Sequence, residues 1–257
     1  MKRVTALVCA ALLLLSLTAC ASEPKGPTVT RSFLAGYEEN IDDHGVPGCS
    51  TRVLLNLLSD GTAEIYVGVL DNNEHSTAKY TGTYTLGENA EFDETISLSY
   101  SYAEGKTAQI ADAVIVDSIF EAPFRLPRGD TVGALRFYES APADMDGDVY
   151  LGYLTKSSGM GPMVYCYALT LHENGTFGVS IMQMASVMHV FGETSGTYTA
   201  DGESITFTYD IRTAEGEVVS EGAISEGSGF DGIRLTTAFN MEQAAMRASD
   251  APFIKVK

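Results

Sequence analysis

The 257-residue sequence predicts an all-β fold with two tandem repeats, each an antiparallel up-and-down β-barrel. Three observations support this prediction. Short motifs recur at a nearly constant spacing, apolar and polar residues alternate in the segments between them, and turn-forming dipeptides separate those segments. The alternation is typical of a strand with one face in water. It is clearest at Ile205, Phe207, Tyr209 and Ile211.

Three motifs reveal the internal repeat. The pairs are Gly36-Tyr37 with Gly152-Tyr153, Asp60-Gly61-Thr62 with Asn174-Gly175-Thr176, and Gly82–Thr85 with Gly196–Thr199. The second and third pairs share one spacing, 114 residues. We therefore divide this part of the chain into repeat 1 at 33–140, an acidic linker at 141–148 and repeat 2 at 149–257.

Each repeat is expected to hold about eight strands. Those of repeat 1 are predicted at 33–38, 51–58, 63–70, 78–85, 95–102, 107–116, 122–127 and 133–139. Repeat 2 follows the same plan, except that 238–250 has a short helical pattern. Asp60-Gly61 and Asn174-Gly175 predict hairpins with type I′ turns, because these residue types tolerate positive φ at both central positions.

Eight short sequential strands favour an up-and-down barrel or a strongly curled sheet, since closure removes exposed strand edges. The order of Gly-Tyr, Asp-Gly-Thr and Gly-Thr-Tyr-Thr resembles the small lipocalin-like (calycin-type) domains of bacterial surface lipoproteins. The resemblance implies a barrel with a possible small-ligand interior and no fixed chemistry. A two-sheet sandwich is the alternative.

The first residues predict export. Lys2 and Arg3 precede an uncharged stretch from Val4 to Ala19, which has the length of a signal peptide and is short for a membrane span. Leu17–Cys20 resembles a bacterial lipobox, and that resemblance implies cleavage after residue 19 and a lipid on Cys20. An ordinary signal cleavage site, which would give a freely secreted protein, is the alternative.

Residues 20–32 predict a lipidated, flexible tether, because they are polar and rich in proline. We expect the protein to contact the membrane through lipid on Cys20 and to lie on the extracytoplasmic face of the cell membrane or envelope.

The charge excludes one class of partner. The chain has 16 Lys and Arg against 34 Asp and Glu, a formal charge of −18, and loss of Lys2 and Arg3 with the signal leaves −20. So acidic a surface repels phosphate backbones, and we expect no nucleic-acid partner.

The cysteines and the acidic linker have structural interpretations. Cys9 leaves with the signal and Cys20 takes the lipid, so Cys49 and Cys166 are the remaining free pair. Two buried thiols are favoured over a disulfide because the residues fall in different repeats. The segment from Asp144 begins like a calcium loop, but Val149 and Thr155 stand where that loop needs glycine and glutamate. We expect no metal and no cofactor.

Methionine is enriched in the second repeat. Aligning the repeats turns Met182 and Met184 away from the barrel core, so we predict that they form an interdomain or partner surface. One alternative is a ligand surface. Another is a copper site, because sulfur ligands suit Cu(I) and this repeat also holds Met160, Met163, Cys166, His172, Met188 and His189.

The sequence indicates less about the function than about the fold. The chain has no Gly-x-Ser-x-Gly, Ser-x-x-Lys, His-Glu-x-x-His or phosphate-loop motif, so we predict no enzymatic activity. The expected function is binding of a small apolar or amphiphilic ligand in a barrel lined by Tyr37 and Tyr153. The alternative is an envelope module with closed barrels that binds a protein or polymer on its outer faces.

Overall fold

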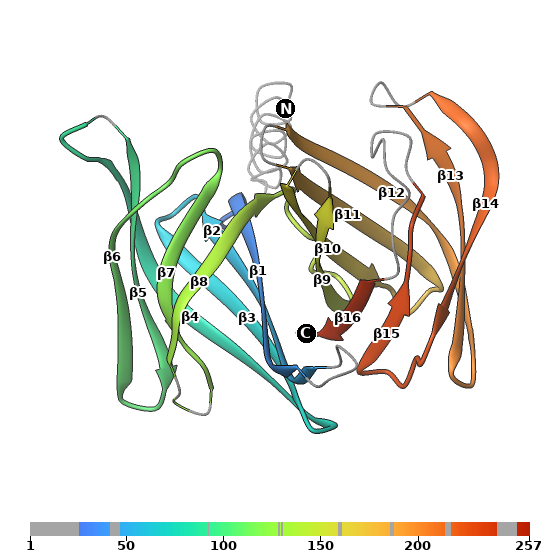
Figure 1. Cartoon of the computed structure of the whole chain (residues 1–257), viewed down its shortest axis with the longest axis horizontal. Coiled ribbons are helices and arrows are strands. Elements are labelled where there is room, and N and C mark those ends of the chain that lie inside the picture. Colours follow the sequence, from blue (N-terminus) through green and yellow to red (C-terminus); the bar gives the residue numbers. More distant parts are fainter. Residues whose placement is uncertain are drawn as a thin grey trace, which may run out of the picture.

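The computed structural model describes residues 26–41, 47–91, 93–127, 129, 131–158, 161–185, 188–213, 217–240 and 251–257. The predicted signal peptide and Cys20 lie outside these ranges. The described chain forms two β-barrels side by side (Figure 1), which we call barrel 1 (β1–β8) and barrel 2 (β9–β16).

All strands are antiparallel to their neighbours. Barrel 1 consists of β1 (Val29–Ile41), β2 (Pro47–Leu58), β3 (Thr62–Asp71), β4 (Glu74–Glu88), β5 (Glu94–Ala103), β6 (Lys106–Val114), β7 (Ile119–Arg125) and β8 (Thr131–Ser140). Barrel 2 consists of β9 (Asp148–Ser158), β10 (Gly161–Leu171), β11 (Thr176–Ala185), β12 (Met188–Asp201), β13 (Ser204–Arg212), β14 (Val218–Ser228), β15 (Arg234–Thr237) and β16 (Ala251–Lys255). The prediction of two tandem up-and-down barrels is confirmed.

The barrels differ in how they close. In barrel 2, β16 pairs with β9 and completes the ring, whereas β6 and β7 form the two edges of the barrel 1 sheet. β7 contains Pro123, which has no N–H to donate, and its pairing with β8 is irregular between Ala122 and Phe124. Proline and bulges blunt a strand edge. The edge strands β6 and β7 nevertheless contact each other, so barrel 1 is nearly closed.

Aromatic rings fill the described part of each interior. In barrel 1, Phe120 stacks on Phe137 with ring centroids 4.6 Å apart, and Tyr100 stacks on Phe124 at 5.2 Å. In barrel 2, Phe207 lies between Phe177 and Phe239, at 4.9 and 5.0 Å. The phenylalanines are at most 1% exposed, so these rings make up much of the two cores.

The hairpin positions are confirmed, but the turn type is not. Gly61 and Gly175 have φ of +84° and +79°, while Asp60 and Asn174 are absent from the described residues with positive φ. The connections are three residues (59–61) and four residues (172–175) long, each with a single left-handed glycine, so the type I′ prediction is wrong. Two consecutive positive φ values occur instead in the two-residue β3–β4 connection at Asn72-Asn73.

The predicted short helix at 238–250 falls mostly outside the described residues. Its first three residues, 238–240, have no regular secondary structure, and Phe239 is fully buried in the core of barrel 2.

The two barrels pack through equivalent strands. β1 contacts β9, and the other contacts come in reciprocal pairs: β1 with β10 and β2 with β9, then β3 with β16 and β8 with β11. Such reciprocity is the mark of a two-fold, isologous interface. The buried cluster between the barrels consists of Leu34, Leu54, Tyr66, Tyr138, Val149, Leu151, Val164, Cys166, Ala168, Met182 and Val256.

A close contact between β1 and β9 requires a glycine. Gly36 on β1 lies against the Tyr153 ring on β9, and a Cβ at position 36 would overlap that ring. Strand pairing explains the match: Gly36 pairs with Arg52 and Tyr153 with Cys166, and positions 52 and 166 are related by the same 114-residue spacing as the hairpins. Gly36 and Tyr153 therefore occupy equivalent positions in the two barrels.

We predict that Gly36→Ala lowers the free energy of unfolding by about 1–3 kcal/mol, because the added methyl overpacks the interface. Gly133→Ala is the matched control, since a Cβ at that β8 position meets nothing within 4 Å. Urea denaturation measures both. In a Tyr153→Ala background the cost of Gly36→Ala should largely disappear; equal stability of Gly36→Ala and Gly133→Ala in the parent chain would contradict the prediction.

Candidate functional site

The two tyrosines expected to line a barrel face different surroundings. Tyr37 is half-buried and packs against the core of barrel 1. Tyr153 belongs to the cluster between the barrels, where its ring lies 6.5 Å from that of Tyr138. This placement corrects the expectation for Tyr153. The Gly-Tyr motifs look equivalent in sequence, but they differ in register by one residue, which turns the second tyrosine to the opposite face.

Met182 is 1% exposed in the inter-barrel cluster, and the half-buried Met184 packs against the same cluster. The side chains of Met188 and His189 lie outside the described residues. Cys49 and Cys166 are free and buried, the first in the barrel 1 core and the second between the barrels. Burial raises the pKa of the Cys166 thiol, so that thiol stays protonated and unreactive.

A buried charge accompanies the inter-barrel contact. Arg52 is 0% exposed, forms an ion pair with Glu38, donates to the Thr51 carbonyl at 3.0 Å, and lies 5.7 Å from the centre of the Tyr153 ring. Ser50 donates to the same Glu38 carboxylate. A buried guanidinium needs these partners because an unpaired one is costly. The arrangement is that of a structural contact between barrels.

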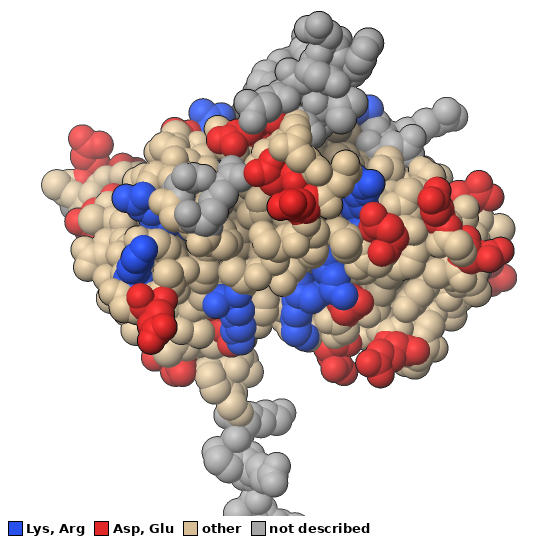
Figure 2. Space-filling model, turned by 90° about the horizontal axis from the view of Figure 1, so that it is seen from below, with Lys and Arg blue, Asp and Glu red and all other residues tan. Residues whose placement is uncertain are grey.

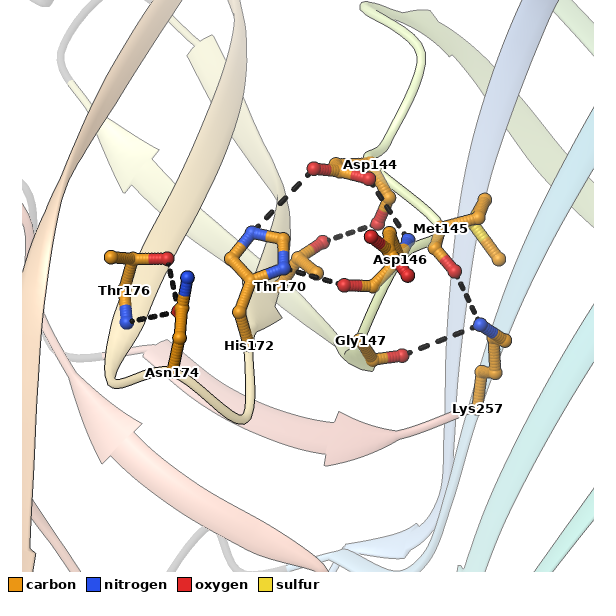
Figure 3. A network of polar contacts seen from close by, with 9 residues as sticks. All are labelled: Asp144, Met145, Asp146, Gly147, Thr170, His172, Asn174, Thr176 and Lys257. Carbon is orange, nitrogen blue, oxygen red and sulfur yellow. Dashed lines mark hydrogen bonds and ion pairs between the residues drawn. The ribbon is translucent and has the colours of Figure 1, made fainter.

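The acidic linker is held against barrel 2 by hydrogen bonds (Figure 3). The His172 ring lies between the Asp146 carbonyl, bonded to Nδ1, and the Asp144 carboxylate, 3.5 Å from Nε2. Thr170 donates to the Asp144 carbonyl at 2.6 Å, and Lys257 donates to the Met145 carbonyl. Of the three carboxylates that would begin a calcium loop, that of Asp144 faces His172 and that of Asp148 lies 2.7 Å from Lys255. No three His, Cys, Asp or Glu side chains in the described ranges are grouped to hold a metal ion.

A groove of about 310 Å³ runs along the outer face of barrel 2, beside this linker. Its lining comes from the linker, β10, β11, β12 and the end of β13: Pro142, Ala143, Asp144, Ala168, Thr170, Gly178, Val179, Ser180, Glu193, Thr194, Ser195 and Arg212. Most of these side chains are small. A pocket of this size is at the lower end of the range that takes small ligands or a few side chains.

The groove exists because barrel 2 lacks the side chains that occupy the equivalent place on barrel 1. Tyr66 pairs with Lys79 across β3 and β4, and Ser180 pairs with Glu193 across β11 and β12, again 114 residues on. By the same spacing Gly178 replaces Glu64. In barrel 1 these side chains form a compact group, with Lys79 5.1 Å from the Tyr66 ring centre and the Tyr66 hydroxyl 2.9 Å from Glu64. In barrel 2 that volume is open.

Two polar groups of the groove lack partners. The Ser180 hydroxyl oxygen is buried and has no hydrogen-bond partner in the structure. Glu193 is exposed and makes no ion pair with any residue of the described ranges. Arg212 at the rim is 3.2 Å from Asp210. The free charge of the groove is therefore negative.

The groove residues were not singled out from the sequence. The signal was present in the repeat alignment, where Tyr66 and Lys79 align with Ser180 and Glu193, a change from large to small and from cation to anion.

The view in Figure 2 shows acidic side chains over both barrels, with several basic side chains near the middle of that face.

The described residues include no helix of the length and hydropathy that crossing a bilayer demands. No family model matches the chain, and the searches of curated proteins and of solved structures find no match either.

Proposed function

We propose that this chain is a lipid-anchored, extracytoplasmic interaction module that binds a protein partner in the groove on barrel 2. The anchor is Cys20, and its support is the lipobox-like sequence at Leu17–Cys20. The resemblance of the motifs to lipocalin-like domains agrees with the barrel architecture. It does not imply a particular chemical reaction, because one fold can host many functions.

The observation that carries the binding proposal is the contrast between the filled interiors and the open groove. Phe120, Phe124 and Phe137 occupy the interior of barrel 1, and Phe177, Phe207 and Phe239 that of barrel 2. The concave surface lies outside, over β10–β12, and has one face built by the linker. This favours partner binding on an outer face over a small ligand held within a barrel.

We predict that the full chain expressed in a bacterial host fractionates with the membrane and enters the detergent phase of a Triton X-114 partition. Cys20→Ser should move it to the aqueous phase, because the thiol that takes the lipid is gone. Mass spectrometry of the N-terminal peptide is the direct readout. An aqueous parent protein with an unmodified Cys20 would contradict the anchor.

The groove is tested by site-specific photocross-linking on intact cells. A benzoyl-phenylalanine at Ser195, an exposed groove residue, should yield one discrete cross-linked protein. The matched control is Thr81, which is exposed at the equivalent place on β4, where Tyr66 and Lys79 fill the space. The Ser195 product should vanish when Ser180→Phe fills the groove. Equal products from both positions, or a product that survives Ser180→Phe, would contradict the groove as the binding site.

A further inference from the structure

The equivalent region of barrel 1 shows which side chains fill the space that is open in the groove on barrel 2. On the barrel 1 side, Tyr66 fills the space between the outer face of β3 and the C-terminal residues, since Gly68 on the same face lies against Lys255 and Val256. On the barrel 2 side, the corresponding space lies between β11 and the linker residues Pro142–Asp144. The strand walls of the two spaces correspond, since β3 pairs with β4 as β11 pairs with β12, whereas the linker wall of the groove lies beyond Ala141, the register counterpart of Lys257.

The residues that differ specify a complementary chemistry. Ser180 leaves the volume of the Tyr66 ring empty, and its buried hydroxyl without a partner lies at the groove. Gly178 leaves open the place of Glu64, whose carboxylate accepts a hydrogen bond from the Tyr66 hydroxyl in barrel 1. Glu193 replaces the cation Lys79 with an anion, so a cation beside the ring must come from the occupant.

Resting on the function proposed above, we infer that the groove takes a partner segment carrying an aromatic side chain next to Lys or Arg. The ring fills the volume that Tyr66 fills on barrel 1, and its edge or hydroxyl reaches Ser180. The adjacent cation pairs with Glu193, with Asp144 as the second acidic group of the rim.

The burial and charge of the groove agree with this occupant. Asp144 is exposed at 58% of its side chain, and the one cation of the lining, Arg212, is placed against Asp210. An anionic segment would be repelled by Glu193, and a segment without a cation would leave Glu193 without an ion-pair partner. Opposite charge at the rim of an interface steers the partner and selects against wrong ones.

The test uses blocked dipeptides and backbone NMR shifts of the chain from residue 21, which keeps every described residue. N-acetyl-Tyr-Lys-amide is the probe and N-acetyl-Tyr-Glu-amide its charge control. At millimolar concentration the first should shift the amide signals of Gly178, Ser180 and Ser195, with an affinity at least about fivefold above that of the second, and added salt should narrow the difference.

Three variants locate the effect. Glu193→Lys should reduce the affinity for the Tyr-Lys probe by about fivefold or more, since it inverts the charge at the rim. Glu88→Lys, the same charge change at an exposed position of barrel 1, should leave the affinity unchanged. Ser180→Tyr should abolish the groove shifts because it fills the volume.

The outcomes separate this inference from the proposed function. Equal affinities for the two probes, shifts outside the groove or no shift at all would overturn the aromatic-plus-cation occupant. If the Ser195 cross-link nevertheless forms and depends on Ser180, the groove still binds a partner and only its chemistry was wrong. Loss of both results would overturn the groove as a site.

Discussion

The contact between equivalent faces of the two barrels is the constraint on which the rest of the structure depends. Gly36 and Tyr153 occupy the same position in their repeats, and one must be a glycine for the other to be a tyrosine. This approach brings β1 onto β9 and places Arg52 at the Tyr153 ring. It also sets the paired spaces beside β3 and β11. Each half of the chain therefore completes the surroundings of the other, as subunits do in a two-fold dimer.

Covalent linkage of the repeats allows the symmetry to be broken, because each half can change its side chains independently. On one side Tyr66, Lys79 and Glu64 close the space with an aromatic ring and an ion pair. On the other side Ser180, Glu193 and Gly178 leave a groove. The pairing of β3 with β4 matches that of β11 with β12, so the strand walls differ in side-chain volume and charge, and the linker adds a further wall to the groove. The proposed binding site therefore lies on a surface of paired strands.

The sequence predicted the strands well and their faces less well. Alternation at Ile205, Phe207 and Tyr209 fixed an inward face, because one side of each strand must be buried. Aligning the two Gly-Tyr motifs gives a strand register that is wrong by one residue. Because a one-residue shift exchanges the two faces of a strand, this alignment placed Tyr153 inside barrel 2, whereas it lies between the barrels. The inter-barrel packing could not be predicted, since apolar residues on an outer face fit many partners. The groove was visible only as a loss of volume between aligned repeats.

The stability of the double variant Ser180→Tyr/Glu193→Lys tests whether the groove is the unfilled counterpart of the Tyr66 site. The two substitutions give barrel 2 the ring and cation of barrel 1. If the spaces are equivalent, the new side chains pack without strain and raise the free energy of unfolding by about 1 kcal/mol, from ring burial and the cation–π contact. A drop in stability below the parent chain, measured by urea denaturation, would show that the groove does not have the shape of the Tyr66 site.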